Sequence, residues 1–205
     1  MATLLEGVVK SLKRNRISSV IFQSGEELLD YLDTLIEDDA TVGVGDSRTL
    51  EALGVYDYLK KRNVTYHNKY DEALNKEDKK ELYLKNFQAD YFLSSANAIS
   101  SDGKIYNMDG NGSRVAPIIY GPKKVLIICG VNKIVKDEKD AVERIRAHAA
   151  PLDAKRLGKK TPCAVTGHCA DCKSKDKICN YFTVIQGQFD ETRIRVIFVN
   201  KELGY

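Results

Sequence analysis

Apolar residues recur along this chain with two spacings, one typical of an amphipathic helix and one typical of a strand. Thr3 and Glu6 have the spacing of a capping box, and the apolar residues after them fall on one helical face. We therefore expect a first helix that ends near Arg16. Ser24 and Glu27 repeat the spacing before a second amphipathic helix.

Strand-length apolar runs alternate with these helices. The run 125–130 is apolar throughout, which fits a central parallel strand covered on both faces. Further strands are expected at 18–23, 41–44, 64–67, 89–95, 104–108, 181–186 and 193–200. A charged helix over 71–86 and an amphipathic helix closed by Pro151 lie between them. The alternation predicts an α/β fold with a mostly parallel, Rossmann-like sheet, helices on both faces and right-handed crossovers.

Glycine-rich loops follow several of the predicted strands. In open α/β sheets, ligands bind in such loops, beyond the carboxyl ends of the strands. In the first loop, Gly43 and Gly45 let the backbone approach an anion, while Ser47 and Thr49 add hydroxyl donors. An ordinary strand-to-helix turn is the alternative interpretation of this loop.

Later loops supply the other candidate residues. We expect ligand-binding groups at Asn97, Gly103, Gly110, Gly112, Arg114, Asn132 and Lys133. Arg114 and Lys133 suit a carboxylate or phosphate because both are cationic and lie in glycine-flanked loops. Asp102 and Asp109 are the candidate general acid and base, because a partly buried carboxyl group beside another can have a raised pKa. Hairpins with Asx turns are the structural alternative.

A cysteine-rich segment lies near the C-terminal end, with the spacing C-x5-C-x2-C-x6-C. Its members are Cys163, Cys169, Cys172 and Cys179. Thiolates at this spacing can converge on one zinc ion or one iron–sulfur cluster, and the spacing does not choose between them. Two disulfides or a set of free thiols are the alternatives. Cys129, inside the apolar run 125–130, is more simply a packed core thiol.

Composition and charge narrow the class of function. The 205 residues include 32 basic and 29 acidic side chains, so the charges nearly cancel and no nucleic-acid-binding field is implied. No apolar run approaches the roughly 20 residues that span a bilayer, and the first residues lack a signal-type pattern. We expect one cytoplasmic domain over 1–205, with a cysteine-rich loop at 161–180 and no binding to membrane or nucleic acid.

Taken in order, the loop motifs form a series that extends over nearly the whole chain. The series comprises the loop Gly43–Leu50, Ser95–Ile99 with Asp102-Gly103, the loop Asp109–Ala116, Gly121-Pro122, the segment Gly130–Val135, Arg144-x-Arg146 and Ala149-Ala150-Pro151. It resembles the lactate-utilisation (LUD) domain family. Within that family the chain resembles a LutC/YkgG-like member. Its added four-cysteine segment departs from the minimal domain and is typical of a subset.

This resemblance implies a fold related to ribose-5-phosphate isomerase, glucosamine-6-phosphate deaminase and the CoA transferases. It also implies a part in the oxidation of L-lactate to pyruvate, beside separate iron–sulfur electron-transfer subunits. On this interpretation, the glycine-rich loops bind a small anionic ligand and the cysteines hold a metal centre.

Two other classes of function are compatible with the residues. A stand-alone enzyme or binding protein would take a sugar phosphate or an acyl-CoA, although the matching loops lack the glutamate nucleophile of the CoA transferases. A regulatory protein with a zinc-stapled loop would have no turnover. A homodimer is compatible with each of these classes.

Overall fold

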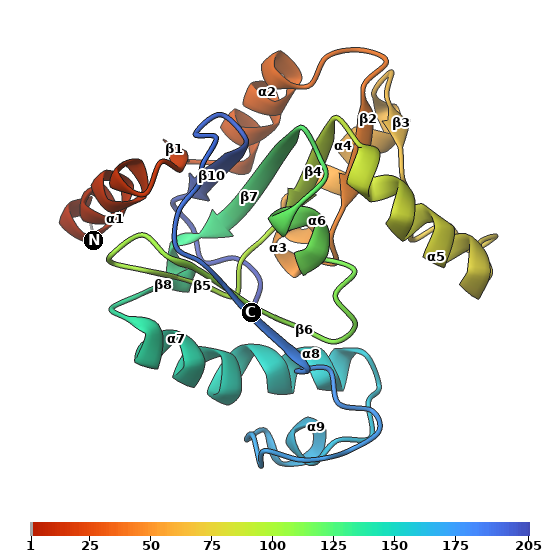
Figure 1. Cartoon of the computed structure of the whole chain (residues 1–205), viewed down its shortest axis with the longest axis vertical. Helices are drawn as coiled ribbons and strands as arrows, with labels where there is room; N and C mark the ends of the chain where they lie inside the picture. Colours follow the sequence, from red (N-terminus) through yellow and green to blue (C-terminus); the bar gives the residue numbers. More distant parts are fainter. Residues whose placement is uncertain (1) are drawn as a thin grey trace.

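The computed structural model describes residues 2–205, and ten strands in this part of the chain form two sheets (Figure 1). The larger sheet has six strands in the order β1-β10-β7-β4-β2-β3, and every neighbouring pair is parallel. In that order they are Ser18–Phe22, Ile194–Val199, Lys124–Gly130, Tyr91–Ser94, Thr41–Val44 and Thr65–Tyr66. The predicted mostly parallel sheet is confirmed, with the run 125–130 inside it.

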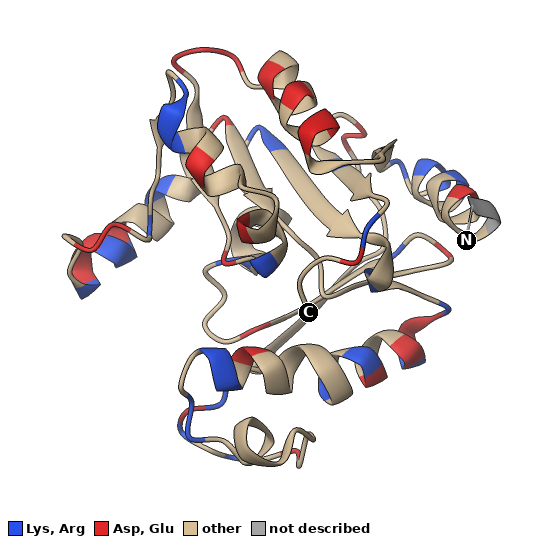
Figure 2. Ribbon diagram, turned by 180° about the vertical axis from the view of Figure 1, so that it is seen from behind, with Lys and Arg blue, Asp and Glu red and all other residues tan. Residues whose placement is uncertain are grey.

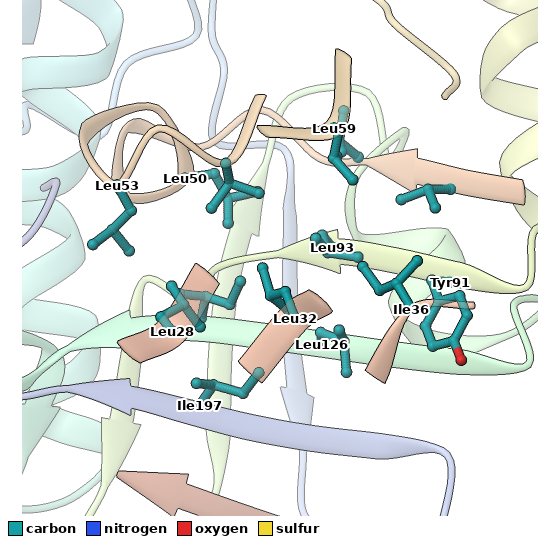
Figure 3. Packing of buried hydrophobic residues seen from close by; sticks show 14 of the residues in the cluster. Leu28, Leu32, Ile36, Leu50, Leu53, Leu59, Tyr91, Leu93, Leu126 and Ile197 are labelled. Carbon is teal, nitrogen blue, oxygen red and sulfur yellow. The ribbon is translucent and has the colours of Figure 1, made fainter. Parts of the chain in front are cut away.

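Three helices cover one face of this sheet. They are α2 (Gly25–Leu35), α3 (Arg48–Ala52) and α4 (Val55–Lys61). Leu28 and Leu32 of α2 are fully buried among strand residues such as Leu126 and Ile197 (Figure 3). Each buried leucine contributes about 1.5–3 kcal/mol to folding, so the apolar period of α2 determines which face turns inward.

The opposite face is covered by α1 (Ala2–Arg14), by α6 (Val115–Ile119) and by the second sheet. Successive side chains of β7 point to opposite faces of the sheet. Ile127 and Cys129 pack against the side covered by α1, while Leu126 and Ile128 pack against α2–α4. Burial on both sides explains why this strand is apolar throughout.

The second sheet has four strands in the order β8-β5-β6-β9. They are Ile134–Val135, Ala98–Ser100, Ile105–Asp109 and Tyr181–Ile185. β5 and β6 pair antiparallel across Asp102-Gly103, as in the hairpin that was the structural alternative for this loop, and Gly103 adopts φ +80° in the turn. β9 pairs with β6, so the hairpin belongs to a sheet separate from the parallel one. The loop patterns of the sequence do not predict this second sheet. The outer face of that sheet packs on α7 (Glu138–Arg144), η3 (Ile145–Ala149) and α8 (Ala150–Arg156).

Capping residues decide where several helices begin. Ser24 accepts a hydrogen bond from the backbone N–H of Glu27 at 3.1 Å, as its spacing predicts. The predicted capping box of Thr3 lies outside the side chains that the structure describes. α5 is Lys76–Lys85 and begins later than expected, because Asn75 caps it with a complete capping box.

Pro151 does not end its helix, contrary to the prediction. Residues Ile145–Ala149 form a wider π-helical turn. Pro151 follows in the first turn of α8, where a helix tolerates a residue that has no backbone N–H to donate. The remaining elements are η1 (Asn86–Gln88), η2 (Val131–Lys133) and α9 (Pro162–Thr166).

The outer surfaces of the helices carry charge of both signs (Figure 2). Acidic side chains dominate α2, whereas α7 carries both acidic and basic groups. No helix in the described part of the chain has the length and apolar character needed to cross a membrane.

Candidate functional site

A pocket of about 560 Å³ lies at the carboxyl ends of β2, β4 and β7. Its walls come from the loops after these strands, from the loop after β6, from α8 and from residues 175–178. Eight basic and four acidic side chains are among the residues that line it, so the pocket is electropositive although the whole chain is nearly neutral.

About half of the residues predicted from the glycine-rich loops line this pocket. They are Gly45, Ser47, Asn97, Asp109, Gly110, Arg114 and Lys133. They come together because parallel strands end at the same edge of the sheet. The other predicted residues, Gly43, Thr49, Asp102, Gly103, Gly112 and Asn132, are not part of its lining.

Three of the six residues outside the lining support the walls. Gly43 is needed for packing, because a Cβ there would lie 2.4 Å from Oδ1 of Asn86. Thr49 is fully buried in α3, and its hydroxyl donates to the carbonyl of Leu203 at 3.3 Å. Asn132 accepts the backbone N–H of Leu203 at 3.0 Å. The last residues of the chain are thereby fixed beside the pocket.

The two aspartates proposed as acid and base do not meet in the pocket. Asp102 lies in the β5–β6 turn, where it pairs with Lys104 at 2.9 Å and its carbonyl accepts from the side chain of Asn15. Asp109 lines the pocket, but it accepts the backbone N–H of Asn111 at 3.1 Å and that of Gly112 at 2.9 Å. Both therefore make the turns that were the structural alternative.

Arg114 joins the loops of the pocket floor. Its guanidinium donates to the Asn97 side chain at 3.1 Å, to the Asn107 side chain at 2.5 Å, and to the carbonyls of Ser95 and Met108. Its Nε lies 3.6 Å from the Asp109 carboxylate. All five donors are thus directed at protein atoms, so Arg114 positions the loops and contributes charge rather than a free N–H group.

Lys133 is the predicted residue with the most unusual surroundings. Its side chain is 4% exposed, and Nζ lies 3.3 Å from Oγ of Ser95. Burial lowers its pKa to about 8, the nearby Cys129 opposes this shift, and the positive charges of Arg144 and Arg114 add to it.

Lys69 is a second, partly buried lysine of the pocket, and the sequence patterns did not single it out. It belongs to the segment between β3 and α5, which carries no glycine-rich or other recognisable motif. Burial lowers its pKa to about 8, with Asp46 opposing the shift and Arg114 and Arg156 adding to it. Only its place in the folded chain brings it to the pocket.

Asp46 and Arg156 form an ion pair on the pocket wall. Their closest atoms are 2.9 Å apart, and the Tyr70 hydroxyl donates to the same carboxylate at 3.0 Å. Burial alone would raise the pKa of Asp46, but Lys69, Arg156 and Tyr70 together hold it below its ordinary value. Asp46 therefore stays ionised and balances part of the positive charge.

The cysteine-rich segment forms one wall of the pocket. Asn180 donates its backbone N–H to the Asp109 carbonyl at 2.9 Å, and this contact places residues 175–178 in the lining. The four cysteines are free and partly buried. Burial raises the pKa of Cys179, Lys177 opposes this rise, and the other three thiols add to it.

Metal binding at these cysteines stays a prediction of the sequence. Within residues 2–205, no group of three or more histidine, cysteine or acidic side chains is arranged to hold a metal ion. A zinc ion or iron–sulfur cluster would therefore require the sulfur atoms to come closer together.

Comparisons with known proteins agree with this architecture. A family model described as the LUD domain matches residues 5–199. The solved structure of a DUF162 family protein from Deinococcus radiodurans is similar over 97% of each chain, with 14% identity and a TM-score of 0.56, which supports the fold alone. A comparison with curated protein sequences finds no match.

Proposed function

Because the chain belongs to the LUD-domain family, we propose that it is a component of L-lactate utilisation whose pocket binds a small anionic ligand. The family is associated with lactate utilisation, and the electropositive pocket lies where α/β sheets bind ligands. Iron–sulfur electron-transfer subunits are the partners that this role would require.

One observation carries the proposal: Lys69 and Lys133 both line this pocket. Among the described residues, neither lysine has a carboxylate within 4.0 Å. An ammonium group withdrawn from water without a carboxylate partner is costly, and an anion bound in the pocket beside either lysine would offset part of that cost. A small carboxylate such as lactate or pyruvate fits this charge, whereas a sugar phosphate is the competing ligand class.

The proposal predicts that each ammonium group contributes to anion affinity. Lys69→Met and Lys133→Met should each weaken binding by about tenfold to a hundredfold, the value of one charge-assisted hydrogen bond. The measurement is calorimetric titration with pyruvate, L-lactate and inorganic phosphate near pH 7.

Lys61→Met is the matched control for these variants, because Lys61 is exposed on α4 and outside the pocket. Tightest binding of phosphate would favour the sugar-phosphate alternative. The proposal fails if the unmodified chain binds none of the three anions, or if all three variants bind equally well.

We also propose that the four cysteines bind a metal, since they lie in one short segment with the spacing C-x5-C-x2-C-x6-C and all four are free and partly buried. Metal binding would order the segment around the ion. Protein purified without oxygen should contain zinc or show iron–sulfur absorption in the visible range, and Cys169→Ser with Cys172→Ser should abolish either signal. Cys129→Ser is the control, and a metal-free wild-type protein with four reactive thiols would contradict the proposal.

A further inference from the structure

Ser95 and Lys133 meet at the floor of the pocket. Ser95 follows the last residue of β4, Lys133 follows β7 in η2, and these two strands are neighbours in the sheet. The adjacent strand ends bring Oγ of Ser95 to 3.3 Å from Nζ of Lys133, and both residues line the pocket.

Lys133 has the surroundings of a lysine that can act as a base. The charged and titratable groups around it are Cys129, Arg144 and Arg114, and no carboxylate among the described residues pairs with it. With a pKa of about 8, about a tenth of these amines are neutral at pH 7. A neutral amine can accept a proton, which an ordinary surface lysine near pH 7 does not.

Ser95 is the residue of the pocket lining whose hydroxyl oxygen contacts the Lys133 ammonium group. Ser47 already caps α3, accepting the backbone N–H of Leu50 at 3.2 Å. The Cys129 sulfur is fully buried, accepts the backbone N–H of Ala96 at 3.4 Å and does not line the pocket. By contrast, the other contacts of the Ser95 hydroxyl are 3.4 Å or longer.

We propose that Ser95 and Lys133 form a nucleophile–base pair that cleaves an ester or thioester of an anionic acyl group. Serine–lysine pairs are a known variant of the serine nucleophile with an adjacent base. The inference rests on the proposed anion-binding function and adds a reaction to the same pocket.

The step balances within this site. The neutral amine of Lys133 takes the hydroxyl proton while Oγ of Ser95 bonds to the acyl carbon, and the bond from that carbon to the leaving oxygen or sulfur breaks. The leaving group receives the proton from Lys133. Lys133, neutral again, takes a proton from the water that attacks the acyl carbon and transfers this proton to Oγ. The bond from the acyl carbon to Oγ breaks, and a carboxylic acid and free Ser95 are released.

The test is acylation of the full-length chain by mono(4-nitrophenyl) succinate, followed by nitrophenol release and peptide mass spectrometry. We expect a succinyl group on Ser95, formed at a rate that rises with pH through about 8. Ser95→Ala should abolish the adduct. Lys133→Met should slow acylation by about a hundredfold or more, and Lys133→Arg should not restore it, because a guanidinium stays protonated.

Ser101→Ala is the control, because this hydroxyl lies in the β5–β6 turn outside the pocket. An adduct on Lys133 or Cys129, or acylation of Ser95→Ala at the wild-type rate, would overturn the pair, as would the absence of any adduct. Pyruvate titration of Ser95→Ala and Lys133→Arg separates the two proposals, since both variants retain positive charge at position 133. If the two variants bind pyruvate but are not acylated, both the anion-binding function and the nucleophile–base pair are supported. If the wild-type protein binds no pyruvate, the anion-binding function is refuted whatever the acylation result.

Discussion

At the scale of single residues, glycines and buried charges set the shape of the pocket. Arg114 and Ser94 occupy the space beside Gly45 and leave no room for a larger residue. A Cβ at this position would lie 2.7 Å from Oγ of Ser94 and 2.8 Å from Cγ of Arg114. The glycine spacing in the first loop therefore reflects close packing as well as access for a ligand.

Gly45→Ala should destabilise the chain by about 1–3 kcal/mol, the usual cost of overpacking, and should weaken anion binding because Arg114 must move. Urea unfolding and pyruvate titration are the measurements. Gly7→Ala is the matched control, since a Cβ there meets nothing within 4 Å and alanine favours the helix by about 1 kcal/mol. Equal effects at both positions would contradict this account of Gly45.

At the scale of elements, the same kind of cap has different consequences on different helices. Ser24 caps α2, which buries Leu28 and Leu32 in the core. Asn75 caps α5, which buries no residue and extends away from the sheets (Figure 1). Loss of the α2 cap should therefore lower the free energy of unfolding of the whole chain, whereas loss of the α5 cap should loosen only that helix.

Ser24→Ala should lower the free energy of unfolding by about 1 kcal/mol. Asn75→Ala should leave that value nearly unchanged while amide hydrogen exchange within α5 becomes faster. Urea unfolding and exchange measured by mass spectrometry test the pair. A global loss in Asn75→Ala as large as that in Ser24→Ala would show that α5 contributes to the cooperative core.

At the scale of the whole molecule, folding concentrates positive charge that the chain as a whole lacks. Lys69 and Lys133 come from segments far apart in the sequence, yet both line the same pocket and have pKa values of about 8. Their protonated forms are disfavoured in the folded state, so the unfolded chain binds more protons over the window from about pH 8 to pH 10.

Stability should therefore rise with pH from about 8 to 10, because a lowered lysine pKa gives ∂ΔG/∂pH a positive sign in this window. Anion binding should fall over the same range as the ammonium groups lose their protons. Urea unfolding and pyruvate titration at several pH values test both trends. The double variant Lys69→Met, Lys133→Met should flatten the stability trend, and an unchanged slope in it would assign the effect to other groups.

The local pattern of the sequence determined the strands of the parallel sheet, the longer helices and part of the site, but not the short strands β5 and β8. Periodic apolar residues identified α2 and β7, and Asp102-Gly103 identified the hairpin, because these signals act between residues close in the chain. The glycine-rich loops located Gly45 and Lys133 because parallel strand ends share one edge of a sheet. The order of the motifs indicated the family that the domain match identifies.

Only the tertiary structure decided which groups share the pocket. Packing brings Ser95 to Lys133 and brings Lys69 to the pocket lining. The segment 175–178 reaches the lining through the hydrogen bond between Asn180 and Asp109. The same packing places Asp102 in a turn outside the pocket and buries Lys133 deeply enough to lower its pKa. Burial and contact between distant segments have no local sequence signal, because they depend on how the completed sheets and helices stack.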